Sequence, residues 1–458
     1  MRELYSRRDV LRLGLSLGAA GLVGCNQDEA AFGFGGHGSE LPITPPRDTT
    51  APGYKALVCV FMAGGNDGFN TVIPLTQEKY DLYSAARLNL AIPQAQLLPL
   101  NATAPDGASY GMQQATTELC QLFNSGRAAV VGNLGSLAYP VNRDDYLASR
   151  RLPARLFSHN DQADQWQSTA TDGAASLDGW AGRLADVLSG ANGNAELPVN
   201  ISVAGANLLQ RGRSSAPFSI SRNGPVKLSW PAGSSLRSVY DSLRSAERGH
   251  PFEQTYAEVH SRAIRLNQLL EASMADAAPL ATAFPATILG AELKMVAQLI
   301  QVRAALGMKR QVFYVSNGGY DTHDGQLANH PARLTELSQA MSAFYQATVE
   351  MGIAESVTSF TASDFGRSLT VNGKGTDHGW SSHHLVVGGA VRGGQFYGGM
   401  PSLVLAGADD TRGGRFIPSV SVDEYAATFA RWLGAADGDL GYIVPNLGRF
   451  ATRGLGFL

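Results

Sequence analysis

The chain has 458 residues, of which 44% are hydrophobic and 16% charged, and its formal net charge is −3. This composition is typical of a globular protein that is long enough for one or two domains. Because the chain is nearly neutral and has no long basic run beyond its amino terminus, we expect no nucleic-acid partner. Its three cysteines are too few for a disulfide framework or a zinc finger.

The first 25 residues have the pattern of an export signal. Arg7 and Arg8 precede the apolar, glycine-rich stretch 13–23, which resembles a twin-arginine signal and is too short for a comfortable membrane span. The segment that ends at Cys25 also fits a lipobox, in which the cysteine is acylated, although small residues and a cysteine can end an apolar stretch by chance. We therefore expect an exported protein of the periplasm or cell envelope. The twin-arginine translocase would be its partner during export, and a lipid anchor at Cys25 its only membrane attachment.

Residues 26–54 are rich in Gly, Pro, Thr and Asp, a composition that predicts a flexible linker. Beyond them, apolar runs of strand length alternate with helical patterns. Strands are predicted at residues 56–62, 128–132, 199–203, 311–315, 357–362 and 385–391, and helices at 116–125, 252–273, 288–306, 331–351 and 423–433. Continuous apolar runs are typical of strands buried on both faces. We therefore predict an α/β fold, an α/β/α sandwich around a mostly parallel sheet, in a single domain that spans 55–458.

Aspartate and histidine gather in glycine-bearing segments that follow the predicted strands. The residues concerned are Asp67, His159, Asp321, His323, Asp364, Asp377 and His378, with His383 and His384 close behind. In an open α/β sheet, ligands bind at the carboxyl ends of the strands, so these clusters predict a metal site. The alternative is that Asp and His cap turns and helix starts, which both residue types do well.

Five short segments resemble the motifs of a known family. They are Gly64-Gly65-Asn66-Asp67-Gly68, Phe157-Ser158-His159, Gly319-Tyr320-Asp321-Thr322-His323, Ser363-Asp364-Phe365-Gly366-Arg367 and Thr376-Asp377-His378-Gly379-Trp380. Together they resemble domain-of-unknown-function family 1501, a family of exported bacterial proteins placed in the alkaline-phosphatase and sulfatase-like superfamily. The resemblance extends from about residue 55 to the end of the chain. It implies an alkaline-phosphatase-like sandwich with a metal-dependent hydrolytic site for a phosphate or sulfate ester, carried by a small molecule or a polymer.

The resemblance also implies one or two divalent ions, for which carboxylate and imidazole ligands favour Zn²⁺ or Mn²⁺. The residues that match metal ligands are Asp67, Asp321, His323, Asp377 and His378, with either His383 or His384 as the final histidine. The strand-end segment around Asp364 matches the superfamily's Ser-Asp-His-Gly motif with Phe365 in place of histidine. Asp364 is therefore an alternative ligand to Asp377, and the sequence leaves this choice open.

Three further residues have predicted catalytic roles, each with a structural alternative. Ser158 occupies the position of the superfamily's nucleophile, or it simply caps a helix. His159 binds a metal or a substrate oxygen, or it packs beside Trp166. Arg367 holds an oxyanion through its planar guanidinium, or it pairs with an acid such as Asp364.

Two hypotheses about function follow. The first is an exported metal-dependent hydrolase of the phosphatase and sulfatase type. The second is a catalytically silent envelope protein that uses the same fold for binding or assembly, because a fold alone does not determine an activity. Of the remaining histidines, we expect His330 to lie in a loop and His37, His250 and His260 to lie at the surface.

Overall fold

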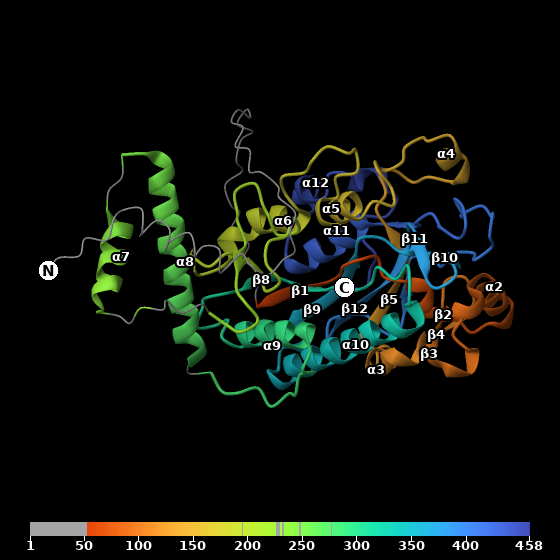
Figure 1. Cartoon of the computed structure of the whole chain (residues 1–458), viewed down its shortest axis with the longest axis horizontal. Helices are drawn as coiled ribbons and strands as arrows, with labels where there is room; N and C mark the ends of the chain where they lie inside the picture. Colours follow the sequence, from red (N-terminus) through yellow and green to blue (C-terminus); the bar gives the residue numbers. More distant parts are fainter. Residues whose placement is uncertain (1–52, 195, 226–229, 231–232, 247–248, 276) are drawn as a thin grey trace. The chain divides into compact units, whose positions relative to one another are not determined.

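A nine-stranded sheet forms the centre of the computed structural model, which describes residues 53–458 except 195, 226–229, 231–232, 247–248 and 276 (Figure 1). The strand order is β13-β5-β12-β9-β1-β8-β6-β7, and β14 also pairs with β5. The strands are β1 (Lys55–Met62), β5 (Ala128–Gly135), β6 (Asn200–Ser202), β7 (Phe218–Ser219), β8 (Arg310–Asn317), β9 (Val357–Ser363), β12 (Ser382–Gly388), β13 (Phe396–Tyr397) and β14 (Val420–Ser421). Strand β12 runs antiparallel to both of its neighbours, whereas the other pairs are parallel. The predicted mostly parallel sheet is therefore confirmed.

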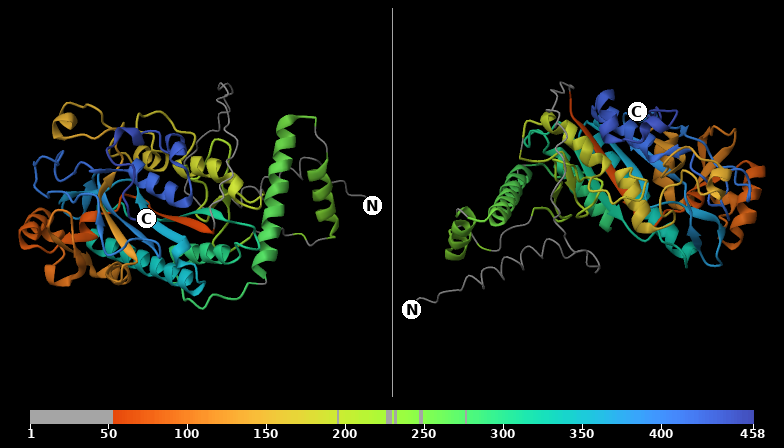
Figure 2. Two further views of the ribbon diagram at one scale, coloured as in Figure 1. Left: turned by 180° about the vertical axis from the view of Figure 1, so that it is seen from behind. Right: turned by 90° about the horizontal axis from the view of Figure 1, so that it is seen from above.

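The side chains of β1 alternate between two hydrophobic cores, one on each face of the sheet. Even-numbered residues such as Val58 pack in one core, and odd-numbered residues such as Phe61 pack in the other. The first core is closed by α3 (Thr117–Asn124), α9 (Ile288–Gln301) and α10 (Gln326–Glu350), and the second by α6 (Trp180–Leu188), α11 (Val422–Leu433) and α12 (Leu440–Ile443). Figure 2 shows these helices on opposite sides of the sheet, which confirms the predicted α/β/α sandwich. Each large apolar side chain that is fully buried here contributes about 1.5–3 kcal/mol.

Smaller elements surround the sandwich. Strands β2 (Val72–Pro74), β4 (Ser109–Gln113) and β3 (Leu97–Thr103) form a three-stranded sheet, and β10 (Arg367–Val371) pairs with β11 (Thr376–His378). The remaining helices are α2 (Gln77–Arg87), α4 (Arg143–Leu147), α5 (His159–Ser168), α7 (Ser235–Ser245) and α8 (Pro251–Ala275). Short 3-10 helices span Gly68–Asn70, Leu88–Leu90, Gln94–Gln96, Gln114–Thr116, Ser189–Ala191, Ala354–Ser356, Asp437–Asp439 and Leu447–Arg449.

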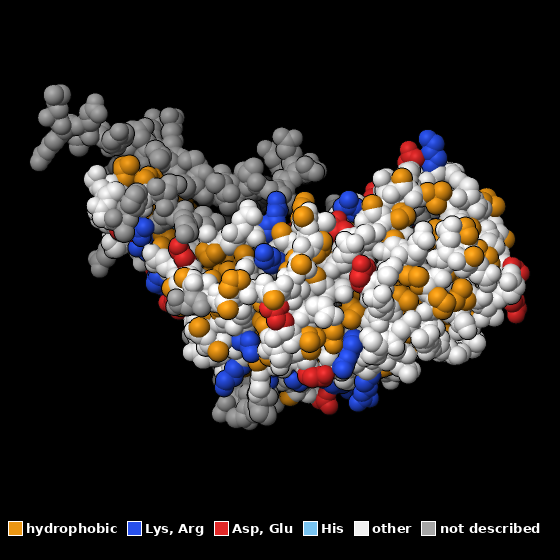
Figure 3. Space-filling model, turned by 90° about the horizontal axis from the view of Figure 1, so that it is seen from below, with side chains coloured by type: hydrophobic (Ala, Val, Ile, Leu, Met, Phe, Trp, Pro, Cys, Tyr) orange, Lys and Arg blue, Asp and Glu red, His pale blue; other side chains and the backbone are white. Residues whose placement is uncertain are grey.

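The export signal, Cys25 and the linker up to residue 52 lie outside the described residues. The described part belongs to the compact unit Pro46–Leu458. Within this part, no helix combines the length and the apolar character that a membrane span requires. On the face shown in Figure 3, basic and acidic side chains lie interspersed among the described residues, without a broad surface of one sign.

Three histidines lie deeper in the fold than the sequence pattern indicates. His330 is not in a loop but in α10, which begins at Gln326, and its side chain is buried against Asn66, with 3.0 Å between Nε2 and Oδ1. His383 and His384 are not beside a loop cluster, because β12 begins at Ser382 and carries both into the core. The prediction failed because it placed the start of this strand three residues too late, at residue 385.

These three imidazoles are held in the neutral form by burial. Burial lowers the pKa of His330 and of His383 to about 4, and the pKa of His384 to about 3. The ring of His383 accepts a hydrogen bond from the backbone N–H of Asn133 at 3.2 Å, which requires an unprotonated nitrogen. All three therefore belong to the packing of the sandwich.

The carboxyl ends of β8, β1 and β9 meet at one edge of the sheet. Met62 at the end of β1 lies opposite Asn317 of β8 and Ser363 of β9 in the strand register. The turn after β1 therefore touches the loops after both neighbours. Gly64 has a φ of +116°, and a Cβ atom there would lie 2.4 Å from the backbone nitrogen of Asp321. Only glycine meets both requirements without strain.

Replacing Gly64 by Ala is expected to lower the free energy of unfolding by about 1–3 kcal/mol, because the left-handed backbone and the contact with Asp321 both disfavour a Cβ atom. Urea denaturation followed by circular dichroism measures this change. The matched control is Gly318→Ala, because Gly318 has open space around it and no positive φ. Equal stability of the two variants would contradict the steric account of this turn.

Acid is expected to destabilise the fold between pH 6.5 and about 4. An unfolded histidine binds a proton near pH 6.5, whereas folded His383 does so only near pH 4, so the unfolded state gains protons first as the pH falls. This loss is roughly 3 kcal/mol for such a histidine. Denaturation midpoints across this pH range should therefore fall less steeply in His383→Gln than in the exposed control His250→Gln. Identical slopes in both variants would contradict this assignment.

Candidate metal centre

Three imidazoles and one carboxylate converge at the edge of the sheet where β8, β1 and β9 end. His159, Asp321 and His378 each offer one ligand atom, and these atoms lie within 4.8 Å of one another. Asp321 Oδ1 is 3.6 Å from His159 Nε2 and 3.7 Å from His378 Nε2. His323 adds a fourth donor, since its Nε2 lies 3.2 Å from Asp321 Oδ1 and 2.8 Å from His378 Nε2. We call these four residues the His-Asp cluster.

The cluster is assembled from three separate segments of the chain. His159 is the first residue of α5, whereas Asp321 and His323 follow β8. His378 ends β11, where it lies opposite Arg367 of β10. The predicted glycine-bearing loop around His378 is therefore a short hairpin, and this hairpin carries His378 to the loop after β8.

Each imidazole of the cluster has an oxygen atom at its other nitrogen. His159 Nδ1 lies 2.7 Å from Asp364 Oδ2, and His378 Nδ1 lies 2.7 Å from the carbonyl oxygen of Phe157. His323 Nδ1 lies 3.5 Å from Asp377 Oδ1. Because a carbonyl oxygen and an ionised carboxylate only accept, the hydrogens of His159 and His378 are on Nδ1. In the neutral rings, the Nε2 lone pairs then face the cluster, which is the arrangement of histidine ligands in metal sites.

The charges in the cluster also suit a cation. Burial lowers the pKa of His378, and the charge of Arg367 lowers it further, so the ring is neutral near pH 7. Burial opposes ionisation of Asp321, but hydrogen bonding and charge from Arg367 outweigh it and hold the pKa of Asp321 below its usual value. The cluster thus presents the neutral ring of His378 beside the ionised carboxylate of Asp321.

Arg367 links the chain segments that carry the residues of the cluster. Its side chain is fully buried and donates to the carbonyl oxygens of Gly64, Gly65 and Thr376. It also pairs with Asp321 Oδ1. The acid that it contacts is therefore Asp321 and not Asp364, which was the acid named in the structural alternative. A second lone pair of the same carboxylate oxygen remains for another partner.

A divalent ion fits this donor set. Ligands that are each about 2.0 Å from a tetrahedral Zn²⁺ lie about 3.3 Å apart. Asp321 Oδ1 lies 3.2–3.7 Å from the three Nε2 atoms, and the Nε2 atoms of His323 and His378 lie 2.8 Å apart. The ligand atoms of His159 and His378 lie within 4.8 Å of each other. His159 Nε2 is buried and has no hydrogen-bond partner within the described part of the chain. A buried lone pair without a partner is costly, and a cation would satisfy it. Imidazole with carboxylate is a donor set that Zn²⁺ and Mn²⁺ both accept.

The structure surrounds Asp67 with donors of its own instead of placing it in the His-Asp cluster. Its fully buried carboxylate pairs with the equally buried Arg87 at 2.5 Å. Gln326 donates to its second oxygen at 2.5 Å, and two backbone N–H groups of the following 3-10 helix donate to the first. Both oxygens are therefore satisfied by the protein itself.

Ser158 occupies the N-cap position of α5, but its side chain does not cap the helix. Its hydroxyl donates to Asp161 Oδ2 at 2.6 Å, and Arg155 contacts the other oxygen of this carboxylate at 2.9 Å. The hydrogen bond from Ser158 and the pairing with Arg155 lower the pKa of Asp161. The Ser158 hydroxyl thus faces a carboxylate of its own helix, while the next residue, His159, reaches the cluster.

Two features of the cluster carried no signal in the sequence. One is the carbonyl group of Phe157, which orients His378 from a residue with a φ of +70°. The other is the role of Phe365, whose ring lies 4.7 Å from His159 and 4.6 Å from His378, centre to centre. The sequence showed only that phenylalanine stands where the superfamily motif has histidine. The aromatic ring supports two imidazoles from one side.

Several solved structures are similar to this chain, all at very low sequence identity. A sulfatase, PsFucS1 from Pseudoalteromonas sp., matches with a TM-score of 0.34 and 12% identity, over 85% of this chain and 69% of its own. The lipoteichoic acid synthase LtaP from Listeria monocytogenes matches with a TM-score of 0.33 and 9% identity, over 87% and 77%. The phosphonate monoester hydrolase SpPMH from Silicibacter pomeroyi matches with a TM-score of 0.32 and 9% identity, over 83% and 73%. TM-scores this low transfer neither a fold nor an activity.

No curated protein matches the chain significantly. The family resemblance of the five motifs is nevertheless confirmed along most of the sequence. The model of the family described as "Protein of unknown function (DUF1501)" matches residues 54–437, and the chain therefore belongs to this family.

Proposed function

We propose that the protein is an exported metal-dependent hydrolase that cleaves a phosphate or sulfate ester. The observation that carries this proposal is the His-Asp cluster, in which three imidazoles direct Nε2 atoms at one carboxylate oxygen. We further propose that His159, His323, His378 and Asp321 hold one divalent ion, Zn²⁺ or Mn²⁺. When bound, such an ion supplies Lewis-acid stabilisation of negative charge and lowers the pKa of a coordinated water.

The other residues of the site position these ligands. Asp364 holds the ring of His159, and the Phe157 carbonyl group holds that of His378, so neither ring needs to reorganise when a ligand binds. Arg367 fixes the position of Asp321 through their ion pair, and its own guanidinium is fully buried and not in contact with solvent. In this proposal Arg367 therefore orients a ligand and does not itself touch the substrate. Asp377 is half exposed beside His323, where a substrate's leaving group could reach it.

We propose water, and not Ser158, as the attacking group. The Ser158 hydroxyl is engaged by Asp161, and no contact joins it to the His-Asp cluster within the described residues. Hydrolysis by water forms one new bond from the water oxygen to phosphorus or sulfur and breaks the bond to the ester oxygen, which leaves with a proton. An exposed carboxylate such as that of Asp377, which accepts from Asn372 at 3.0 Å, can relay that proton.

Localisation completes the proposal. The twin-arginine pattern at Arg7 and Arg8 supports export, and Cys25 supports a lipid anchor at the cell envelope. Proteins that use this route cross the membrane folded, which suits a metal ion inserted before export. The substrate would then be an ester outside the cytoplasm.

The metal content of the purified protein is the first test. Protein prepared without added metal is expected to contain about one equivalent of Zn or Mn by elemental analysis. His159→Ala and His378→Ala should each lose this metal, because each removes a direct ligand. Asp364→Asn should weaken metal affinity about 10- to 100-fold, since it removes only the negative charge beside His159 Nδ1 and leaves the ligand in place. Competition with a chelator measures the affinity.

The surface variant His250→Ala is the control, and its metal content should equal that of the parent. Metal retained in full by His159→Ala and His378→Ala would contradict the proposed ligands. A parent protein that binds metal tightly but hydrolyses neither aryl phosphates nor aryl sulfates would instead support a catalytically silent binding or assembly protein on this fold.

Turnover tests the attacking group. With an aryl phosphate or aryl sulfate as substrate, Ser158→Ala is expected to retain kcat within about threefold. Removing a hydroxyl that has only a structural role lowers kcat much less than removing the nucleophile does. Asp377→Asn should lower kcat about 100-fold or more if this carboxylate relays the proton. Loss of turnover in Ser158→Ala, with metal content unchanged, would return the attacking role to Ser158.

A further inference from the structure

A cavity lies at the opposite end of α5 from the His-Asp cluster. It has a volume of about 680 Å³, which is within the range of small-molecule binding sites. His159 is the first residue of α5 and Ser168, on the wall of the cavity, is the last. A helical rise of 1.5 Å per residue places these two ends about 14 Å apart. The cavity is therefore separate from the proposed metal centre.

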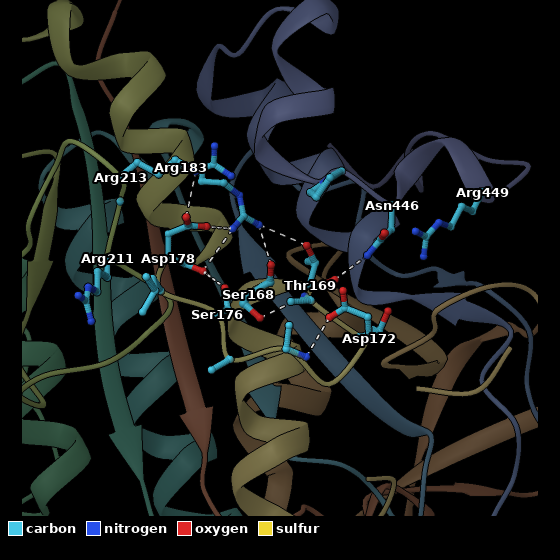
Figure 4. Close-up of a pocket in the computed structure, with 17 residues that line it drawn as sticks. Ser168, Thr169, Asp172, Ser176, Asp178, Arg183, Arg211, Arg213, Asn446 and Arg449 are labelled. Carbon is cyan, nitrogen blue, oxygen red and sulfur yellow. Dashed lines mark hydrogen bonds and ion pairs between the residues drawn. The ribbon is translucent and has the colours of Figure 1, made fainter. Parts of the chain in front are cut away.

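The walls of the cavity are fixed by Arg183, which is buried and whose side chain contacts three segments. Its guanidinium donates to the carbonyl oxygen of Ser168 at the end of α5 and to that of Ile443 in α12. It also pairs with Asp178, which lies just before α6 (Figure 4). Since all of these contacts are within the protein, Arg183 shapes the cavity and is not available to a ligand.

The loop around Arg211 packs closely against α6. A Cβ atom at Gly182 would lie 2.0 Å from the carbonyl oxygen of Arg211, so glycine is required for this approach. The backbone N–H of Gly179 donates to the same oxygen at 2.8 Å. The walls on this side are thus held by backbone contacts, and the cavity does not depend on a ligand to keep its form.

The charges that line the cavity favour an anion. Four arginines, Arg183, Arg211, Arg213 and Arg449, face two aspartates, Asp172 and Asp178. Asp178 is shared by Arg183 and Arg213, so it neutralises neither fully. Within the described residues, no hydrogen bond or ion pair engages the side chain of Arg211. Among the described residues, Arg449 donates to the carbonyl oxygen of Ala138, lies over the ring of Tyr139 and interacts electrostatically with the buried Asp423.

The arginines stand on two sides of the cavity. Figure 4 shows Arg211 and Arg213 on one side, and Arg449 beside Asn446 on the other. The stem of Arg213 is fixed by its Nε hydrogen bond to Asp178 and by the ring of Tyr442. The planar forks of arginine bind carboxylate, sulfate and phosphate groups in a bidentate manner. Each side of the cavity thus offers its own binding group for an anion.

We propose that this cavity binds a small molecule with two anionic groups, one held by Arg211 and Arg213 and the other by Arg449. Succinate is the probe, and its uncharged analogue succinamide is the matched control. Isothermal titration calorimetry at low ionic strength should detect binding of succinate and no binding of succinamide. Succinate should also raise Tm, because a ligand of the folded state stabilises it. Salt should weaken the binding, since it screens exposed charges.

Variants locate the binding. Arg211→Gln and Arg449→Gln should each weaken succinate binding at least about tenfold, since each removes a charge-assisted contact. Arg127→Gln, at an exposed arginine that pairs with Glu355 elsewhere, should bind succinate like the parent. An unchanged Tm of each variant without ligand shows that the fold is intact.

His159→Ala distinguishes this cavity from the proposed metal centre. Succinate binding that persists in His159→Ala supports the cavity whether or not the protein is a hydrolase. Binding that disappears in His159→Ala would assign succinate to the metal centre and overturn the proposal. The proposal is equally overturned if the parent binds no succinate at millimolar concentration, if succinamide binds as well, or if Arg211→Gln combined with Arg449→Gln leaves the affinity unchanged.

Discussion

The buried guanidinium of Arg367 is the interaction on which the rest of the site depends. Removing such a charge from water costs several kcal/mol, and this cost is offset only where the donors find acceptors of suitable geometry. Here the acceptors are carbonyl oxygens from the turns after β1 and β8 and from β11, together with the carboxylate of Asp321. Each acceptor belongs to a segment that carries or supports a cluster residue. The same cation therefore sets where Asp321 lies and keeps it ionised.

The sequence was sufficient to predict the class of fold and the edge of the sheet where the cluster lies. Continuous apolar runs identified the central strands, and the carboxyl ends of neighbouring parallel strands meet by necessity at one edge. It was not sufficient to predict which aspartate joins the cluster. Asp67 and Asp321 both follow glycine turns, but Arg87 is twenty residues beyond Asp67 in α2, and nothing local indicates that this helix returns to neutralise it. A local sequence pattern does not reveal the charged partner of a residue when that partner lies far along the chain.

The environments of two nearby histidines were also not predictable from the local sequence. His378 and His383 are only five residues apart, yet one faces the cluster and the other the core. The difference arises because β11 is a short hairpin strand at the edge, whereas β12 is central in the main sheet, between β5 and β9. The sequence shows where each histidine stands along the chain. Whether its side chain faces the cluster or the core depends on where the strands begin and end. The backbone carbonyl group of Phe157 was beyond prediction for a simpler reason, because every residue has one.

Helix α5 joins the His-Asp cluster to the arginine-lined cavity, although its sequence has little reason to be helical by itself. It is polar, with buried glutamines, and a ten-residue helix is marginal without tertiary contacts. Its position comes from its ends and its middle: Asp364 holds His159 at the start, Trp166 packs beside His384, and Arg183 binds the carbonyl oxygen of Ser168 at the end. The orientation of a cluster ligand thus depends on a guanidinium about 14 Å away along the helix. A helix that is held at both ends can keep an imidazole in the orientation that a metal site requires.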